Sequence, residues 1–129
     1  MPSLLKTPVH LGLGATVVVQ PEFSGMEWYM DYAERVAGDG AEGRLVAMSD
    51  WSGDWTSWEM HPAGDELVVC VEGTMTVHQE QPDGSVVSVT LGPGDYAINR
   101  PGVWHTADVP ERATALFVTS GLGTEHRPR

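Results

Sequence analysis

The chain has one cysteine, few basic residues and no long apolar run. Its lone thiol, Cys70, has no partner for a disulfide within the chain, which favours a reducing compartment. Seven Lys and Arg residues stand against 18 Asp and Glu residues, and the net charge of −11 repels nucleic-acid phosphates and anionic lipid surfaces. No segment has the apolar length of a signal peptide or a membrane span. We therefore expect a cytoplasmic protein that binds neither nucleic acid nor membrane.

Internal repeats and low-complexity linkers are also missing, and 129 residues suffice for one domain with its own core. The hydrophobic pattern changes once, near residue 38. We expect residues 1–42 to form an arm, with one strand and one helix, that packs on a barrel formed by residues 43–129. The strand of the arm is predicted at Ala15–Val19, and Pro21 stops it.

The helix of the arm is predicted at Met26–Ala37. Ser24 and Glu27 have the spacing of a capping box, and Gly38 and Gly40 end the helix. Apolar side chains recur at helical spacing within it, namely Met26, Tyr29, Met30, Ala33, Val36 and Ala37. We expect this stripe to pack against the rest of the domain, although such a stripe also suits a face that docks a partner.

From Gly43 onward the pattern is typical of β-structure. Short runs rich in Val, Leu, Thr and Trp are separated by turn sequences that contain Gly, Pro and Asp. Roughly six to eight strands at this spacing predict an all-β sandwich or barrel. The plainest hairpin signal is Pro82-Asp83-Gly84, because Pro presets a turn and Gly accepts a positive φ.

Possible metal ligands gather on the predicted strands. Strand alternation places Glu59 and His61 on one face of their run. The short turn that follows makes the next run an antiparallel neighbour, so Glu66 comes close to His61. The later segment from Gly94 can return a second imidazole, His105, to the same place. Two imidazoles and up to two carboxylates suit a divalent transition metal.

The residues around this cluster resemble the two sequence motifs of the cupin family. Gly53, His61, Glu66 and Gly73 match the first motif, and Gly94, Gly102 and His105 match the second. The chain departs from the motifs at Glu59, which replaces a histidine, at Arg100, which replaces a proline, and at Val109, which replaces an asparagine. The resemblance implies an all-β fold of the double-stranded β-helix type, the cupin jelly-roll barrel, here with a short N-terminal helix.

The resemblance also implies a divalent transition metal, with Mn, Fe, Zn and Ni as candidates. Its ligands would be His61, Glu66 and His105. The role of Glu59 is open. As a fourth ligand it would favour Mn²⁺ or Fe²⁺, because carboxylate oxygens are hard donors. As a general base it would stand free beside a facial triad. As a structural residue it would pair with Arg44 or Arg100.

Other residues near the motifs are weaker candidates. Trp55 shares the ligand face and is a candidate lining of a substrate pocket, whereas Trp58 lies on the opposite face. Cys70 also lies on the ligand side, where we expect a small buried hydrophobe. Tyr96 and Asn99 are further pocket candidates. The histidines expected at the surface or in local hydrogen bonds are His10, His78 and His126.

The leading functional hypothesis is a metal-dependent enzyme that acts on a small molecule, of the isomerase or lyase type or of the non-haem dioxygenase type. The alternative is a barrel that binds or senses a metal or a small molecule without turnover. Since cupins commonly pair through edge strands and N-terminal segments, the resemblance also implies a homodimer. Candidate covers of a sheet edge are Ala15–Val19 and the helix Met26–Ala37.

Overall fold

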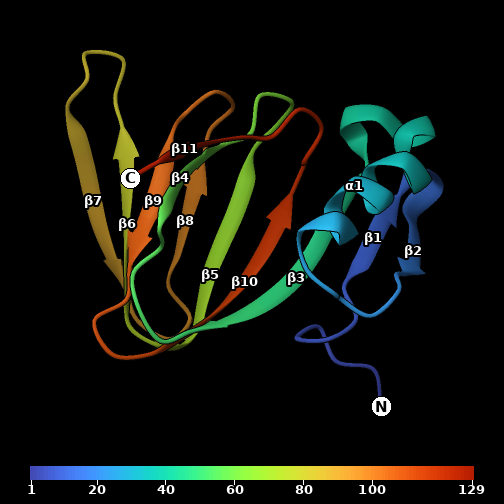
Figure 1. Ribbon diagram of the computed structural model, residues 1–129, viewed down its shortest axis with the longest axis horizontal. Helices are drawn as coiled ribbons and strands as arrows, with labels where there is room; N and C mark the ends of the chain where they lie inside the picture. The colour runs from blue at the N-terminus through green and yellow to red at the C-terminus, as the bar shows by residue number, and fades with distance from the viewer.

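The computed structural model describes residues 1–129, which form two antiparallel β-sheets that face each other (Figure 1). The strands are β1 (Val9–Gly12), β2 (Thr16–Val19), β3 (Arg44–Trp51), β4 (Ser57–Met60), β5 (Glu66–Gly73), β6 (Met75–Glu80), β7 (Val86–Leu91), β8 (Tyr96–Asn99), β9 (His105–Asp108), β10 (Ala113–Thr119) and β11 (Glu125–Pro128). The helices are α1 (Met26–Arg35) and two 3-10 segments, Leu13–Ala15 and Ala37–Glu42. No helix has the length and apolar character needed to cross a membrane.

The strand order defines a jelly-roll sandwich. One sheet has the order β2-β1-β3-β10-β5-β8, and the other has the order β11-β4-β9-β6-β7. The predicted all-β fold class is therefore confirmed. Nine strands rather than six to eight follow Gly43, because four-residue strands such as β4, β9 and β11 carry too little alternation to be counted from sequence.

The predicted hairpin at Pro82-Asp83-Gly84 joins β6 to β7. Gly84 has a φ of 85°, the left-handed region that favours glycine. The Asp83 carboxylate accepts hydrogen bonds from the backbone N–H and the hydroxyl of Ser85, at 2.9 and 2.6 Å. These local contacts stabilise the turn and fix the register in which Val77 faces Val89.

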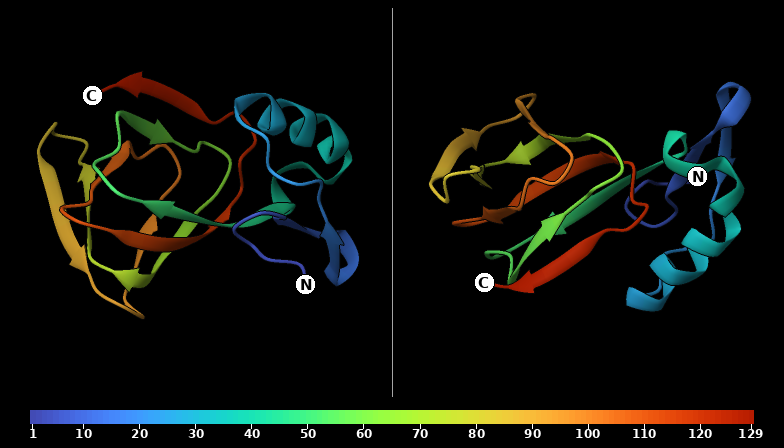
Figure 2. Two further views of the ribbon diagram at one scale, coloured as in Figure 1. Left: turned by 60° about the horizontal axis from the view of Figure 1, so that its bottom comes forward. Right: turned by 90° about the horizontal axis from the view of Figure 1, so that it is seen from above.

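The N-terminal arm holds two strands where one was predicted. β1 pairs with both β2 and β3, so the arm extends the six-stranded sheet at its edge. The turn between β1 and β2 uses positive φ at Gly14 and Ala15, so Ala15 belongs to the turn rather than to the strand. In both views of Figure 2, β1, β2 and α1 lie together at one side of the sandwich.

The predicted helix starts correctly at Met26, but its cap, end and buried face were wrong. Ser24 does not cap it, since Gly25 is the N-cap and no side chain bonds there. The helix ends at Arg35, and Ala37 already belongs to the following 3-10 segment. Most of the predicted stripe points outward, because Met26 is 69% exposed and Met30 is 72% exposed, and only Val36 at its end packs against the buried face.

Aromatic stacking determines which face of α1 is buried. Trp28 and Tyr32, one helical turn apart, stack in parallel with ring centroids 5.4 Å apart. Both are buried and form a small core with Leu45 of β3. Two large rings remove more apolar surface from water than the flexible methionines would, so their side of the helix faces the sheet.

The main core fills the space between the two sheets. Its buried members come from the inward-facing positions of both sheets: Val68, Cys70, Met75, Val77, Leu91, Ala97, Ala107, Val109, Ala113 and Ala115. Three larger rings pack against it, namely Trp51, Trp55 and Phe117. Small alanines in β9 and β10 leave room for these rings, which border the polar cluster described below.

Replacing Trp28 with Ala should lower the free energy of unfolding by about 3–5 kcal/mol, since it empties the core between α1 and β3. Met30→Ala on the same helix is the matched control and should change stability by less than about 0.5 kcal/mol. Urea unfolding monitored by circular dichroism measures both values. Equal losses in the two variants would show that the assigned buried face is wrong.

Candidate metal centre

Glu59, His61, Glu66 and His105 come together at one end of the sandwich. Glu59 lies near the end of β4, and His61 follows that strand directly. Glu66 and His105 are the first residues of β5 and β9, and His105 is the ladder partner of Glu59. One nitrogen or oxygen atom from each side chain lies within 4.8 Å of those of the other three. The structure thus brings together all four residues singled out from the sequence. The predicted hairpin is wrong, however: β4 and β5 lie in different sheets, so His61 and Glu66 meet across the sandwich rather than along one sheet.

The two imidazoles face the carboxylates without forming aligned hydrogen bonds. Nε2 of His61 lies 2.9 Å from Oε1 of Glu59 and 3.1 Å from Oε2 of Glu66. Nε2 of His105 lies 3.2 Å from Oε1 of Glu66 and 4.0 Å from Oε1 of Glu59. Both Nε2 atoms are nevertheless buried and without a hydrogen-bond partner. Donor atoms that crowd together without bonding one another are arranged as the ligands of a cation are.

Hydrogen bonds on the far side of each ring assign the protons. Nδ1 of His105 lies 3.2 Å from the Val103 carbonyl oxygen, which can only accept. The Thr124 hydroxyl donates to the Gly121 carbonyl oxygen, so it accepts the Nδ1–H of His61 at 2.7 Å. In each neutral ring the proton therefore sits on Nδ1, and the Nε2 lone pair faces the cluster.

Glu66 is held more firmly than any other member of the cluster. The Asn99 amide donates to Oε1 at 3.1 Å, and the Thr119 hydroxyl donates to Oε2 at 2.6 Å. Gln79 in turn donates to the Asn99 side-chain oxygen at 2.8 Å. These neighbours fix the orientation of a fully buried carboxylate. Asn99, a candidate pocket residue from the sequence, supports the carboxylate instead.

The charges of His61 and Glu66 stabilise each other in the metal-free protein. Burial lowers the pKa of His61, but the adjacent carboxylates of Glu59 and Glu66 outweigh burial and raise it to about 9. Burial likewise raises the pKa of Glu66, but the adjacent imidazoles of His105 and His61 outweigh it and hold the pKa far below its usual range. A cation entering the cluster therefore displaces a proton from His61.

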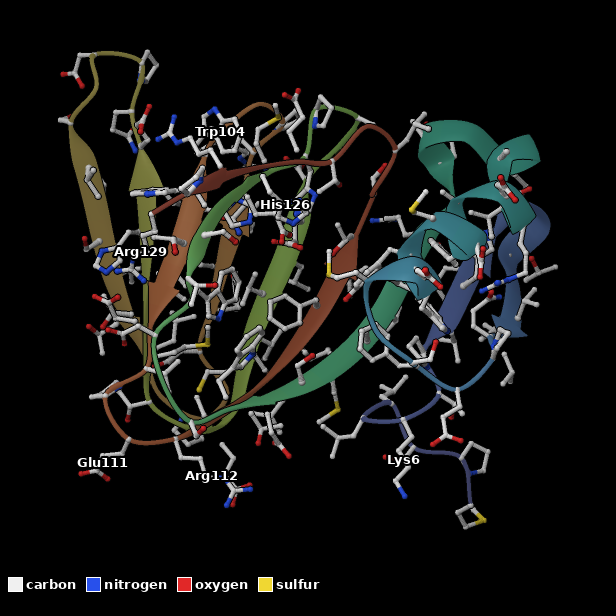
Figure 3. All side chains as sticks on the ribbon, viewed as in Figure 1. Lys6, Trp104, Glu111, Arg112, His126 and Arg129 are labelled. Carbon is white, nitrogen blue, oxygen red and sulfur yellow. The ribbon has the colours of Figure 1, made fainter.

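Glu59 is the exposed member of the cluster, with 27% of its side chain accessible. One oxygen faces His61, and the other lies 3.1 Å from Nε2 of His126 on β11. The ion pair with Arg44 or Arg100 does not form, since Arg100 binds Asp65 at 3.1 Å and Arg44 makes no salt bridge. In Figure 3, His126 lies toward the upper end of the sandwich, opposite the end that carries Glu111 and Arg112.

The histidines expected at the surface or in local hydrogen bonds all contact side chains at least ten residues away in the sequence. His126 contacts Glu59, as described above. His10 is buried and bonds the Tyr32 hydroxyl and the Asp39 carboxylate, each at 2.7 Å. His78 lies between Ser88, at 2.6 Å, and Asp108, at 2.8 Å. Of these three histidines, only His126 lies beside the metal-ligand cluster, and neither sequence motif includes it.

The aromatic candidates divide as strand alternation predicts. The ring centroid of Trp55 lies 6.4 Å from that of His105, on the ligand side. Trp58 lies on the other side of its strand, beneath the guanidinium of Arg127. Tyr96 is 62% exposed on the outer face of its sheet, away from the cluster. Cys70 is a buried core residue whose pKa is raised by burial, so it is no nucleophile.

The sandwich, the buried imidazole pair and the spacing of their motifs define the class of protein. A family model described as "Cupin domain" matches residues 48–121. The chain therefore belongs to the cupin family, in agreement with the resemblance inferred from its sequence. No protein of curated function matches it.

Solved structures with the same fold are distant in sequence. A cupin-2 domain containing protein from Shewanella frigidimarina has 20% identity and a TM-score of 0.50, over 67% of this chain and 71% of that one. An oxalate oxidase has 14% identity and a TM-score of 0.54, over 63% and 44%. A hydroquinone 1,2-dioxygenase in complex with Cd²⁺ and 4-hydroxybenzonitrile has 17% identity and a TM-score of 0.52, over 59% and 56%. These likenesses show the fold alone.

The raised pKa of His61 predicts a pH dependence for the metal-free protein. The pKa is higher in the folded chain, about 9, than the ordinary 6.5. The stabilisation of the folded chain by the charged His61 is therefore complete below pH 6.5, and it is lost as the pH rises through about 9. In the presence of a chelator, the stability difference between wild type and His61→Gln should shrink by on the order of 2 kcal/mol across this interval. Urea unfolding at several pH values measures it, and a constant difference would contradict it.

Proposed function

We propose that this chain is a metal-dependent cupin that acts on a small molecule, with Glu59, His61, Glu66 and His105 as the metal ligands. The observation that carries the proposal is the pair of buried Nε2 atoms that lie beside carboxylates without bonding them. Two nitrogen and two oxygen donors fit a divalent transition metal. Among Mn, Fe, Zn and Ni, the two carboxylates favour Mn²⁺ or Fe²⁺.

Glu59 is proposed both as a ligand and as the residue that moves a proton. It is the only exposed ligand, and its two oxygens face different partners, His61 and His126. A bound metal would supply Lewis-acid polarisation of a carbonyl or carboxylate. Beside it, the outer oxygen of Glu59 is placed to accept a proton, with His126 positioned to hold the carboxylate in that orientation. Isomerase, lyase and non-haem dioxygenase chemistry all fit this arrangement.

A second candidate function is binding or sensing without turnover. Two cavities of about 300 Å³ lie elsewhere in the molecule. One is lined by residues that include Glu72 and Arg112, and the other by residues that include His10 and Arg35. Neither touches the metal-ligand cluster.

Metal content tests the ligand set directly. His105→Ala should lower the affinity for the metal by at least about 100-fold, because it removes a ligand rather than a support. His78→Ala is the matched control, since that histidine also bonds a carboxylate but lies outside the cluster. Elemental analysis of the purified proteins compares them. Stoichiometric metal in the His105 variant would overturn the assignment.

Substitution of Glu59 separates its two proposed roles. Glu59→Gln should weaken metal binding, because a neutral amide is a poorer ligand, whereas Glu59→His should keep the metal. Titration of each variant with Mn²⁺ measures the affinities. If Glu59→Gln instead binds metal as wild type does and loses only turnover, Glu59 is a base and not a ligand.

We further propose that the chain forms a homodimer through the outer face of its six-stranded sheet. A row of apolar residues crosses all six strands in register: Val19, Val9, Val46, Val118, Leu67 and Ile98. A second row beside it contains Met48, Leu116, Val69 and Tyr96. An apolar surface this wide, roughly 24 Å at the usual strand spacing, is typical of an interface between subunits.

A charge placed on this face should separate the two copies. Tyr96→Glu with Ile98→Glu should halve the mass measured by light scattering at micromolar concentration, because each copy would bury unpaired charges. Val87→Glu is the control, since Val87 is also exposed but lies in the other sheet. A monomeric wild type, or a double variant that remains dimeric, would contradict the proposal.

A further inference from the structure

The N-terminal arm holds a cavity of about 300 Å³ that lies apart from the metal-ligand cluster. It is bordered by β1, β2, the end of α1 and the 3-10 segment that follows, on the side of the molecule away from β6 and β7 (Figure 1). His10, which lines it, is the ladder partner of Val18 and Leu45, and Leu45 packs against α1. The cavity therefore lies on the face of the sheet that α1 covers, opposite the apolar outer face.

Two opposite charges line this cavity without pairing with each other. Arg35 and Asp39 are only four residues apart in the sequence, and their charges attract. Arg35 nevertheless forms no salt bridge, and the only salt bridge of Asp39 is with His10, at 2.7 Å. Other contacts must therefore keep the cation and the anion apart.

Arg35 is oriented by a buried amide and an aromatic ring. Its Nε–H donates to Oε1 of Gln20 at 3.1 Å, and its guanidinium carbon lies 5.6 Å from the centroid of the Trp28 ring. Gln20 is buried, and its own amide nitrogen donates to the Val18 carbonyl oxygen at 3.3 Å. The guanidinium is thus bound through its Nε edge, and its two terminal amino groups have no hydrogen-bond partner in the protein.

Asp39 is oriented by a buried imidazole. Its Oδ2 accepts the Nε2–H of His10 at 2.7 Å, and Nδ1 of the same ring lies 2.7 Å from the Tyr32 hydroxyl. Two glycines make room for this pair, because a Cβ at Gly43 would lie 2.7 Å from Cε1 of His10 and one at Gly12 would lie 3.1 Å from Oδ2 of Asp39. Both ring nitrogens are occupied, so the other oxygen of Asp39 is the acceptor left for a ligand.

A guanidinium and a carboxylate that line one small cavity favour a ligand with both charges. A simple anion would be attracted to Arg35 but repelled by Asp39, and a simple cation would meet the reverse. The terminal amino groups of a guanidinium match a carboxylate, and a carboxylate oxygen accepts from an ammonium group. The rest of the lining includes apolar side chains, namely Val18, Pro21 and Val36.

We propose that this cavity binds a small zwitterion, a free α-amino acid with a short apolar side chain. The carboxylate of the ligand binds the terminal amino groups of Arg35, and its ammonium group donates to the free oxygen of Asp39. His10 and Gln20 are positioning residues that keep the two charges apart. The inference does not depend on the proposed metal-dependent function, since the cavity shares no residue with the metal-ligand cluster.

The test compares three related probes on the full-length protein. L-alanine carries both charges, N-acetyl-L-alanine lacks the ammonium group and L-alaninamide lacks the carboxylate. Trp28 reports on the cavity, because its indole N–H donates at 2.9 Å to the carbonyl oxygen of Pro21 in the lining. In heteronuclear NMR, L-alanine should shift the Trp28 indole signal. It should bind at least about threefold more tightly than either singly charged probe, as expected for one partly exposed charge contact.

Two variants assign each charge of the ligand to its partner. Asp39→Asn keeps an acceptor for His10 but removes the charge, so L-alanine should lose its advantage over N-acetyl-L-alanine alone. Arg35→Gln should remove its advantage over L-alaninamide alone. Arg112→Gln, which lies at the other cavity, is the control and should keep both preferences.

Three results would overturn the inference. Glycine, L-alanine and L-valine, which span short side chains, could all leave the Trp28 signal unmoved. A singly charged probe could bind as tightly as L-alanine, which would mean that the cavity receives an anion or a cation alone. The variants Asp39→Asn and Arg35→Gln could both keep the wild-type preferences. The first two results come from wild-type protein, so they do not depend on how a variant folds.

Discussion

The buried carboxylate of Glu66 is the constraint on which the rest of the site depends. An isolated carboxylate in this position would be protonated, but two imidazoles, the Asn99 amide and the Thr119 hydroxyl keep it ionised. Those partners come from β8, β9, β10 and the turn after β4. A single charged group therefore ties both sheets together at this end of the sandwich, whereas apolar packing fills the main core between them.

Around this fixed point, the exposed side of the site is built from the two ends of the chain. β11 brings His126 to the outer oxygen of Glu59, and Thr124, just before it, orients His61. At the other side, Trp28 and Tyr32 dock α1 on β3. A rigid interior thus carries the ligands, and the terminal segments shape what reaches them.

The sequence was sufficient for features that depend on local spacing. Motif spacing located His61, Glu66 and His105. The predicted hairpin between the first two was wrong, however, because β4 and β5 lie in different sheets and the two side chains meet across the sandwich. Features that depend on long-range packing were not predictable. Thr119, Thr124 and His126 lie more than 50 residues from their partners and follow no motif. The buried face of α1 was misassigned because helical spacing alone does not rank two stacked rings above a stripe of methionines.

The central claim is that the two unbonded imidazole nitrogens and the two carboxylates share one metal ion. Anomalous diffraction at the manganese edge, from crystals of protein loaded with Mn²⁺, tests it most directly. The account predicts one peak at roughly 2.0–2.3 Å from Nε2 of His61, Nε2 of His105 and one oxygen each of Glu59 and Glu66. A peak elsewhere, or a site in which the imidazoles bond the carboxylates with no metal between them, would contradict it.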